Sequence, residues 1–318
     1  MQAASNNLTS AVSLPRFHAP RWIHALAVLT VIAAFPLLFL GAEVTTKGVG
    51  MADQRPIVNP LAALWEIVTG QQSGGWVIEH SHRLAGWFVG LCGIALAAAL
   101  WLGESRRWLQ WLGTAALVLI AAQGLLGIFR VQLNALLGPT LAWVHGSFAP
   151  IVLATLVSVA LFTSAGWTVE QVANLPAAGQ AALRRWSLAM VAMVYLQLVL
   201  GGMVRHQGSM LAARGHLLGA FAVTAGLLWL VKLGWDIDAC RWPNRMILGL
   251  LGMQTLLGVE AWFSWMRRYF VPSAASDEST ALQWLRSGHY VMGTMLLATT
   301  VVLMLQVYRS TCRKEAPA

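Results

Sequence analysis

The stretch HRLAGWFVGLCGIALAAALWL, from His82 to Leu102, decides the fold class. It contains one charged residue, Arg83, and as a helix it is long enough to cross the hydrocarbon core of a bilayer, which is about 30 Å thick. Seven further runs of similar length and polarity lie around it, and they extend from Trp22 to Ala42, Trp108 to Val131, Leu141 to Ala165, Leu183 to Val204, Leu211 to Leu233, Met246 to Met266 and Leu285 to Tyr308. The sequence therefore predicts an all-α membrane protein with eight transmembrane helices.

The composition of the chain also favours a membrane protein. Of its 318 residues, 58% are hydrophobic and 10% are charged, whereas a soluble domain carries about 25% charged residues. This difference excludes a soluble enzyme, a disordered chain and a protein that binds nucleic acid. The basic residues behind the net charge of +9 stand between the apolar runs and never form a run of five. They are typical of topology signals and cofactor contacts.

The positions of the basic residues indicate the topology. Eight spans put both termini on one side of the bilayer, and twelve of the 21 Lys and Arg residues fall on that side. Because positively charged segments stay in the cytoplasm, we predict a multi-pass protein of the cytoplasmic membrane. Its cytoplasmic parts are an N-terminal tail at 1–21, a linker at 167–182 and a C-terminal tail at 310–318. The long connections 43–81 and 267–284 then face the outer side, where long loops often serve binding.

Histidines recur at one level of the predicted helices. The second, fourth, sixth and eighth runs each carry one near their start, namely His82, His145, His216 and His289. These runs all enter from the outer side, so the four side chains lie at about the same depth. The third, fifth and seventh runs each contain Gln followed four residues later by Gly, at Gln123 and Gly127, Gln197 and Gly201, and Gln254 and Gly258. The first run, with only Phe35 to Gly41 in the corresponding region, diverges.

This recurrence predicts two pseudo-repeated four-helix bundles, at 22–166 and 183–309, each with two histidines. A single histidine in a membrane span usually hydrogen-bonds to a neighbouring helix. Four at one depth favour another role, because two imidazoles that face each other across a four-helix bundle form an axial ligand pair for heme iron. A zinc site would require carboxylate or thiolate ligands at the same level, and neither half supplies them. We therefore predict that the four histidines ligate heme iron.

Small residues and one arginine lie on the same faces as the histidines. Gly86, Gly90 and Gly93 follow His82 on one helix face, which suits either close helix packing or a macrocycle. Gln123, Gly127 and Arg130 share a face that ends at the histidine layer, where Arg130 either pairs with a heme propionate or extends to the interface. The remaining histidines receive no role in this interpretation; they are His18, His24, His80 and His206.

Three ordered motifs carry a resemblance to a known family. They are E-x-x-H-R from Glu79 to Arg83, G-x-x-V-T-x-x-G-V-G-M-A-D from Gly41 to Asp53, and Q-G-L-L-G from Gln123 to Gly127. Together with a histidine in each even run, this set resembles the heme A synthase family over essentially the whole chain.

The resemblance implies oxidation of the C8 methyl group of heme O to a formyl group, which gives heme A for terminal oxidases. It implies that His82 and His145, in the N-terminal half, face heme O or heme A, and that His216 and His289, in the C-terminal half, ligate a retained heme b. Arg83 and Arg130 are then expected to contact bound heme. The implied partners are the lipid bilayer, a heme O synthase and an electron donor that the sequence does not identify.

Glu79 matches the acidic residue of the family motif, and that match implies a catalytic role. It also lies three residues before His82, hence on the same helix face, where a carboxylate can orient water or relay protons. The alternative is an ordinary ion pair with Arg83, four residues further on. Many members of the family carry a cysteine pair in the first outer loop, and this sequence has none there. The segment Ser273 to Thr280 receives no function.

Two other functions compete with the heme-modifying enzyme. A membrane cytochrome with two hemes b, which carries electrons without modifying heme, would use the same four histidines. A transporter with a site between its repeats is disfavoured, because the even runs carry no acidic residue at mid-depth. Glu79 and the long first outer loop favour the enzyme, since an electron carrier needs no cover over a substrate.

Overall fold

A computed structural model describes residues 19–55, 59–168, 176–271 and 279–311. Eight of its helices are long and apolar enough to cross a membrane. They are α1 (Arg21–Thr46), α3 (Gly75–Gly103), α4 (Arg107–Gln132), α6 (Pro139–Thr163), α7 (Ala177–Gln207), α8 (Met210–Leu233), α9 (Arg241–Phe270) and α10 (Thr280–Thr311). The shorter helices are α2 (Pro60–Val68), α5 (Asn134–Leu137), η1 (Ala165–Thr168) and η2 (Asp238–Cys240), and the described ranges contain no strand. The predicted all-α membrane protein with eight spanning helices is confirmed.

Several helices extend beyond their apolar runs. Helix α3 begins at Gly75, not at His82, because helical hydrogen bonding continues after the chain has left the apolar region. Glu79 and His80 therefore lie within the helix, above the histidine layer. The residue before the helix, Gly74, has a φ of 61°, in the left-handed region that favours glycine.

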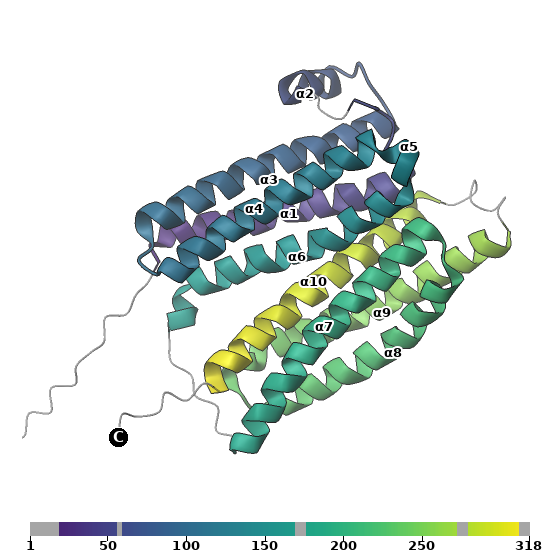
Figure 1. The fold of residues 1–318 in the computed structure, drawn as a ribbon. Coiled ribbons are helices and arrows are strands. Elements are labelled where there is room, and N and C mark those ends of the chain that lie inside the picture. Colours follow the sequence, from purple (N-terminus) through teal and green to yellow (C-terminus); the bar gives the residue numbers. More distant parts are fainter. Residues whose placement is uncertain (1–18, 56–58, 169–175, 272–278, 312–318) are drawn as a thin grey trace, which may run out of the picture.

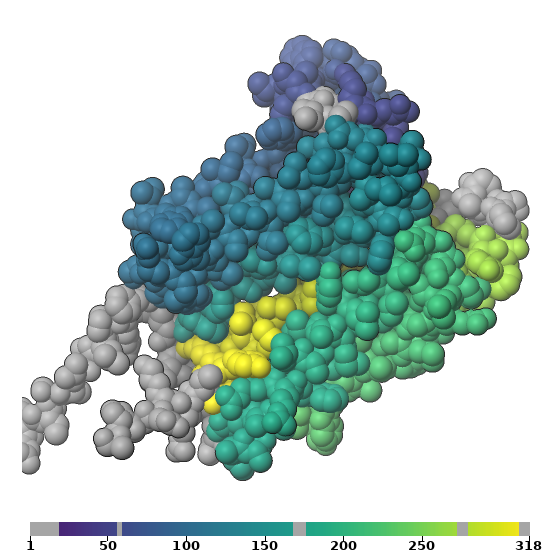
Figure 2. All heavy atoms as spheres, viewed as in Figure 1, coloured from purple at the N-terminus to yellow at the C-terminus, as the bar shows by residue number. Residues whose placement is uncertain are grey.

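The helices pack as two groups of four (Figure 1). In the N-terminal group, α1 and α4 each contact both α3 and α6. In the C-terminal group, α7 and α9 each contact both α8 and α10. The groups meet where α10 packs on α1 and α6, and where α6 packs on α7. Figure 2 shows the same division on the surface, with α10 in yellow visible between a blue-to-teal half and a green half. That one half is a repeat of the other stays a prediction.

The termini of the bundle lie at one end. The first turn of α1 and the last turn of α10 are close to the same end of the molecule, and α2 and α5 lie toward the opposite end (Figure 1). This agrees with an even number of crossings. The cytoplasmic tails and the linker were predicted at 1–21, 310–318 and 167–182; residues 1–18, 312–318 and 169–175 of them lie outside the described residues, as do positions 273–278 of the unassigned loop.

The apolar core occupies the part of each half that is nearer the termini. In the N-terminal half it is built around Leu100, Leu109 and Leu156, and in the C-terminal half around Met190 and Leu303. This packing leaves the opposite part of each half to the histidines and the polar residues around them.

A short turn holds α3 and α4 together at the core end. Arg106 donates hydrogen bonds to both carboxylate oxygens of Glu104, at 2.7 to 3.0 Å, and the Gln110 side-chain amide donates to the Glu104 carbonyl at 2.6 Å. Burial raises the pKa of the Glu104 carboxyl, but the hydrogen bonds from Arg106 outweigh it and the pKa is lowered. The carboxylate therefore stays charged and stabilises the turn.

Candidate functional site

The four histidines singled out in the sequence form two pairs. His82 on α3 and His145 on α6 have ring centroids 6.5 Å apart and ring planes at 82°. His216 on α8 and His289 on α10 have centroids 6.2 Å apart and planes at 87°. Each pair joins the second and the fourth spanning helix of its half.

Both separations fit a metal ion held between two imidazoles. A metal–nitrogen bond of about 2.0 Å, with the ring centroid about 1.2 Å behind the nitrogen, places two such centroids about 6 Å apart. No cluster of three or more His, Cys, Asp or Glu that could hold a metal ion occurs among the described residues. Two protein ligands on opposite sides suit heme iron, because the macrocycle supplies the other four nitrogens.

Backbone carbonyls set the orientation of one histidine in each pair. His82 Nδ1 lies 3.1 Å from the carbonyl oxygen of Leu37, and His216 Nδ1 lies 3.0 Å from that of Gln197. A carbonyl only accepts hydrogen bonds, so the proton is on Nδ1 and the lone pair of Nε2 is free to bind a metal. In the other two rings a glutamine amide nitrogen lies near Nε2, from Gln123 to His145 at 3.3 Å and from Gln254 to His289 at 3.4 Å.

A glycine faces each of the four imidazoles. A Cβ atom added at Gly41 would lie 2.8 Å from His82 Cε1, and one at Gly201 would lie 2.8 Å from His216 Cε1. The same construction at Gly127 and Gly258 gives 3.4 Å to His145 and 3.0 Å to His289. The first span was predicted to diverge from the Gln–Gly pattern of the third, fifth and seventh spans. It does so at the glutamine position, where it has Leu37. At the glycine position it does not diverge, because Gly41 faces His82 as Gly201 faces His216. The signal that could have revealed it is Gly41, four residues after Leu37.

One cavity connects the two pairs. Its volume is about 1440 Å³, and its wall includes all four histidines, the glycines that face them and many apolar side chains from both halves. A pocket for one small molecule measures about 300 to 1000 Å³. The space therefore suits more than one ligand, or one ligand much larger than usual.

Glu79 lines this cavity and stands three residues before His82 in α3. Its side chain is 4% exposed, and Arg83 Nη2 donates to Oε1 at 2.6 Å. The backbone N–H of Asp53 donates to the other oxygen, Oε2, at 2.9 Å. The ion pair that the sequence left as the alternative role of Glu79 is thus present, together with a contact to the preceding loop that the sequence did not indicate.

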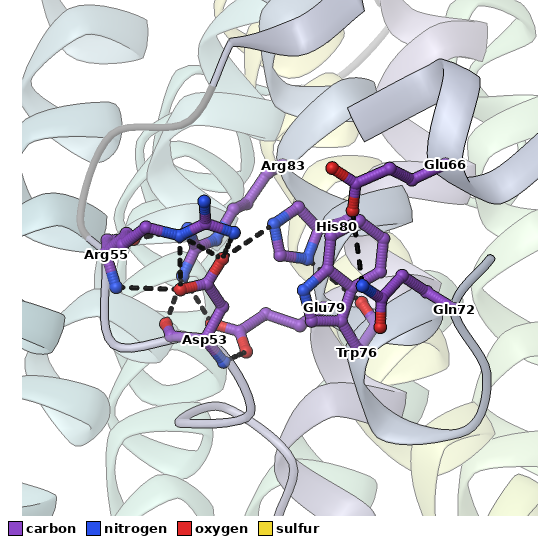
Figure 3. Close-up of polar contacts among 8 residues, drawn as sticks. All are labelled: Asp53, Arg55, Glu66, Gln72, Trp76, Glu79, His80 and Arg83. Atoms are coloured by element: carbon purple, nitrogen blue, oxygen red, sulfur yellow. Dashed lines mark hydrogen bonds and ion pairs between the residues drawn. The ribbon is translucent and has the colours of Figure 1, made fainter. Parts of the chain in front are cut away.

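Arg83 ties the same loop to α3. It donates to the carbonyls of Asp53 at 2.9 Å and Arg55 at 2.6 Å, in addition to Glu79 (Figure 3). Its donors are therefore directed to protein groups, although the side chain also lines the cavity.

His80, which received no role from the sequence, belongs to this network (Figure 3). It is fully buried, it stacks on Trp76 with centroids 3.6 Å apart, and its Nε2 lies 3.2 Å from Asp53 Oδ2. Asp53 also accepts from Arg55 Nε and Nη2 at 2.7 to 3.0 Å, and these bonds lower its carboxyl pKa to about 2. The available signal was that Asp53 ends one family motif and His80 stands inside another.

Comparison with known families identifies the group to which the chain belongs. A family model described as cytochrome oxidase assembly protein, COX15-CtaA, matches residues 26–220, which is more than half of the 318 residues. The chain belongs to this family. The resemblance to heme A synthases drawn from the motifs is thereby confirmed at the level of the family. No curated protein matches the chain.

The family match covers three of the four paired histidines of this cytochrome oxidase assembly protein and ends before His289. Arg130, also within the match, lies in the last turn of α4 with its guanidinium against Gly50, on the wall of the cavity. No hydrogen bond or ion pair joins Arg130 to another described residue. Its donors are available to an anionic group in the cavity, as a heme propionate would supply.

Proposed function

We propose that this member of the family is a heme A synthase, an oxidoreductase that converts the C8 methyl group of heme O to a formyl group. In this proposal His82 and His145 face heme O and its product heme A, while His216 and His289 hold a resident heme b. The heme A would serve the assembly of a terminal oxidase, and a heme O synthase and an electron donor would be its partners.

An asymmetry around two similar histidine pairs carries the proposal. The residues three before and one after the paired histidine of α3 are Glu79 and Arg83; at the same offsets in α8 they are Ala213 and Leu217. Seven residues after the glutamine of α4 stands Arg130, and at that offset in α9 stands Ala261. Arginines line the cavity in both halves, since Arg205, Arg268 and Arg286 stand in the C-terminal half, but among the described residues Glu79 is the one carboxylate on its wall. The N-terminal pair therefore combines its two histidines with a carboxylate, and the C-terminal pair does not.

The residues around the N-terminal pair suit proton transfer beside a bound porphyrin. Heme supplies iron redox chemistry when it is bound, and oxidation of a methyl to a formyl group removes four electrons and requires repeated proton transfers. Glu79 Oε1 is held by Arg83, and Oε2 accepts one N–H, so the carboxylate is oriented yet keeps lone pairs for a water or a proton. The mainly apolar wall around it limits the access of bulk water.

The second candidate is a cytochrome with two hemes b that only carries electrons. The close agreement of the two pairs, at 6.5 and 6.2 Å, favours it, since two equal sites suit two equal hemes. The carboxylate of Glu79 beside the N-terminal pair favours the enzyme, because an electron carrier needs no carboxylate at one of its sites.

Mass analysis of bound porphyrins tests the proposal directly. The full chain is expressed with a supply of heme O, and the hemes are extracted and weighed. Heme A should appear with the wild-type chain and be absent when His82 and His145 are both replaced by alanine. Wild-type protein that binds heme O and heme b but never yields heme A would leave the electron carrier as the better function.

The proposed orientation places the termini in the cytoplasm of a cell bounded by the cytoplasmic membrane, with both heme sites toward the outer face. Cysteine labelling of intact cells tests it at two exposed positions, Ser73 at the end near the histidines and Ser105 at the other end. An impermeant reagent should modify Ser73→Cys and spare Ser105→Cys. The reverse pattern would show that the orientation is wrong.

A further inference from the structure

The contacts of the histidines place the two halves in a common register. The carbonyl groups that hold the Nδ1 atoms belong to Leu37 in α1 and Gln197 in α7, and the glycine that faces each ring stands four residues later in both helices. Helix α3 thus corresponds to α8, aligned on their histidines, and α4 corresponds to α9, aligned on Gln123 and Gln254. This register allows the walls of the two sites to be compared residue by residue.

At three wall positions on α3 and α4 the N-terminal half has glycine where the C-terminal half has a larger residue. Four and eight residues after the histidine, α3 has Gly86 and Gly90, where α8 has Ala220 and Thr224. One residue after the glutamine, α4 has Gly124, where α9 has Thr255. All six residues line the cavity. At these three positions the N-terminal site lacks a side chain that the C-terminal site has.

The missing side chains correspond to open space. A Cβ atom added at Gly90 or Gly124 would meet nothing within 4 Å, and one at Gly86 would meet only Leu37 Cδ1, at 3.9 Å. Some positions differ in the opposite direction. Ala149 in α6 against Gly293 in α10 adds no room to the C-terminal site, because Leu198 and Gln254 already lie 3.0 and 3.1 Å from a Cβ at that glycine. Ala42 in α1 against Gly202 in α7 adds none either, because Trp143 lies 2.9 Å from a Cβ at Gly202. Arg83 and Arg130 are larger than Leu217 and Ala261, their counterparts in the C-terminal half.

The cavity reaches the outer surface of the helices beside these glycines, as it does in the C-terminal half beside Phe221, Val259 and Phe263, so the two sites differ here in the side chains that fill the space and not in access to lipid. Three large side chains beside the glycines, Trp87, Leu91 and Leu125, line the cavity and are also 53%, 61% and 52% exposed. In a membrane these surfaces face lipid. An apolar chain attached to a ligand in the N-terminal site can therefore pass between α3 and α4 toward the acyl region without crossing a polar layer.

We propose that Gly86, Gly90 and Gly124 make the N-terminal half selective for a porphyrin with a long isoprenoid substituent, and that Ala220, Thr224 and Thr255 restrict the C-terminal half to a porphyrin with short substituents. The inference rests on the proposed function, since heme O differs from heme b by such an isoprenoid chain. It explains how one chain with two similar histidine pairs keeps substrate and resident heme in different halves.

The test transfers the side chains of one half to the other. Gly90→Thr combined with Gly124→Thr copies Thr224 and Thr255 into open space, so the protein should fold. The purified full chain, without a reductant, is incubated with equal amounts of heme O and heme b, and the bound hemes are extracted and counted per chain. Wild type should bind one of each. The variant should lose heme O by about tenfold or more and retain heme b at one per chain or above.

Gly252→Thr is the matched control, because a Cβ at this exposed glycine also meets nothing within 4 Å and the residue does not line the cavity. It should bind both hemes as wild type does. The reciprocal variant, Thr224→Gly with Thr255→Gly, should raise heme O above one per chain and reduce heme b.

Two results would overturn the inference: a Gly90→Thr, Gly124→Thr chain that binds heme O as wild type does, and a wild-type chain that binds no heme O. Failure of the proposed function is a separate result. It would appear as normal discrimination between the two hemes with no heme A formed once reductant and oxygen are supplied.

Discussion

The two halves of the chain present nearly the same pair of imidazoles in different surroundings. Ring separations of 6.5 and 6.2 Å and the four glycines that face the rings are common to both. The connections before the paired helices differ: α1 and α3 are joined by a long segment that contains α2, whereas α7 and α8 are joined by Gly208 and Ser209 alone. The longer connection contacts Glu79 and Arg83 through Asp53 and Arg55.

The histidine pairs and their surroundings depend on different parts of the structure. Each pair is set by the way buried helices align with one another, so its geometry is nearly the same in both halves. The carboxylate of Glu79 and its contacts to the preceding loop belong to the N-terminal half and lie at the histidine end of α3, where a change costs little packing, whereas arginines line the cavity in both halves. Under the proposed function, the N-terminal pair is the site for chemistry and the C-terminal pair is the site for a resident heme.

The largest expected effect comes from removing one pair at a time. His216→Ala with His289→Ala should abolish the six-coordinate, low-spin heme b spectrum, because both strong-field ligands are lost. His82→Ala with His145→Ala should leave that spectrum intact and abolish heme A. Absorption spectra of the purified proteins measure the first effect and extracted porphyrins the second. A heme b spectrum that survives the first double substitution would contradict the assignment of the C-terminal half.

The next effect concerns the carboxylate that only one half has. Glu79→Gln keeps the shape and removes the charge, so heme A formation should fall about a hundredfold, the usual scale for a lost general acid or base. Heme b should remain in the distant half, and heme O or a hydroxylated intermediate should accumulate. An ion pair with Arg83 alone contributes only about 0.2 to 0.5 kcal/mol, so unchanged product would leave Glu79 as a structural partner.

Glu43→Gln is the matched control for this substitution. Glu43 is also a buried carboxylate, near the C-terminal end of α1 and 3.4 Å from Lys47 four residues on, and it does not line the cavity. Its replacement should leave heme A formation within about twofold of wild type. This result would show that the effect of Glu79→Gln comes from the position of that carboxylate on the cavity wall and not from the loss of any buried charge.

A smaller effect should follow from adding one methyl group against a ring. Gly201→Ala places a Cβ atom 2.8 Å from His216 Cε1, and the displacement should lower heme b affinity by about tenfold. Gly41→Ala should affect heme O in the same way and spare heme b. Gly127→Ala, where the distance is 3.4 Å, should change little. Titrations with each heme measure these affinities, and equal effects of all three variants would show that the glycines do not position the imidazoles.

Much of this arrangement could be predicted from the sequence because it depends on local periodicity. Apolar runs of membrane length predicted the eight helices, and regular crossing placed His82, His145, His216 and His289 at one depth. The pairing of the histidines within each half follows from that order.

The rest depends on contacts between segments whose approach no local pattern specifies. The contact of Gly41 with His82 was not predicted, because Leu37 stands where the other odd-numbered spans have glutamine. The backbone carbonyl of Leu37 nevertheless orients His82, and it does not depend on the side chain. The contact of Asp53 with His80 joins a loop to a helix 27 residues away, and its partners are fixed only when that loop folds over α3. Helix periodicity placed His80 on another face than His82 and gave no indication of its contact with the buried carboxylate of Asp53.

The smallest expected effect is a pH dependence confined to the N-terminal half. The hydrogen bond from Arg55 lowers the pKa of Asp53 from 3.8 to about 2, so the folded loop favours the ionised carboxyl. The ionised carboxyl stabilises the folded loop fully above about pH 4. This stabilisation is lost as the pH falls toward about 2, because Asp53 has a higher pKa in the unfolded loop and is protonated there first. Hydrogen exchange of residues 47–55, corrected for the intrinsic rate at each pH, should show protection that decreases about tenfold over this interval. Residues 205–210, at the short turn of the other half, should show no such step, and neither should the loop of Asp53→Asn. A step of the same size in Asp53→Asn would mean that another group holds the loop, and the network around Glu79 would then not depend on Asp53.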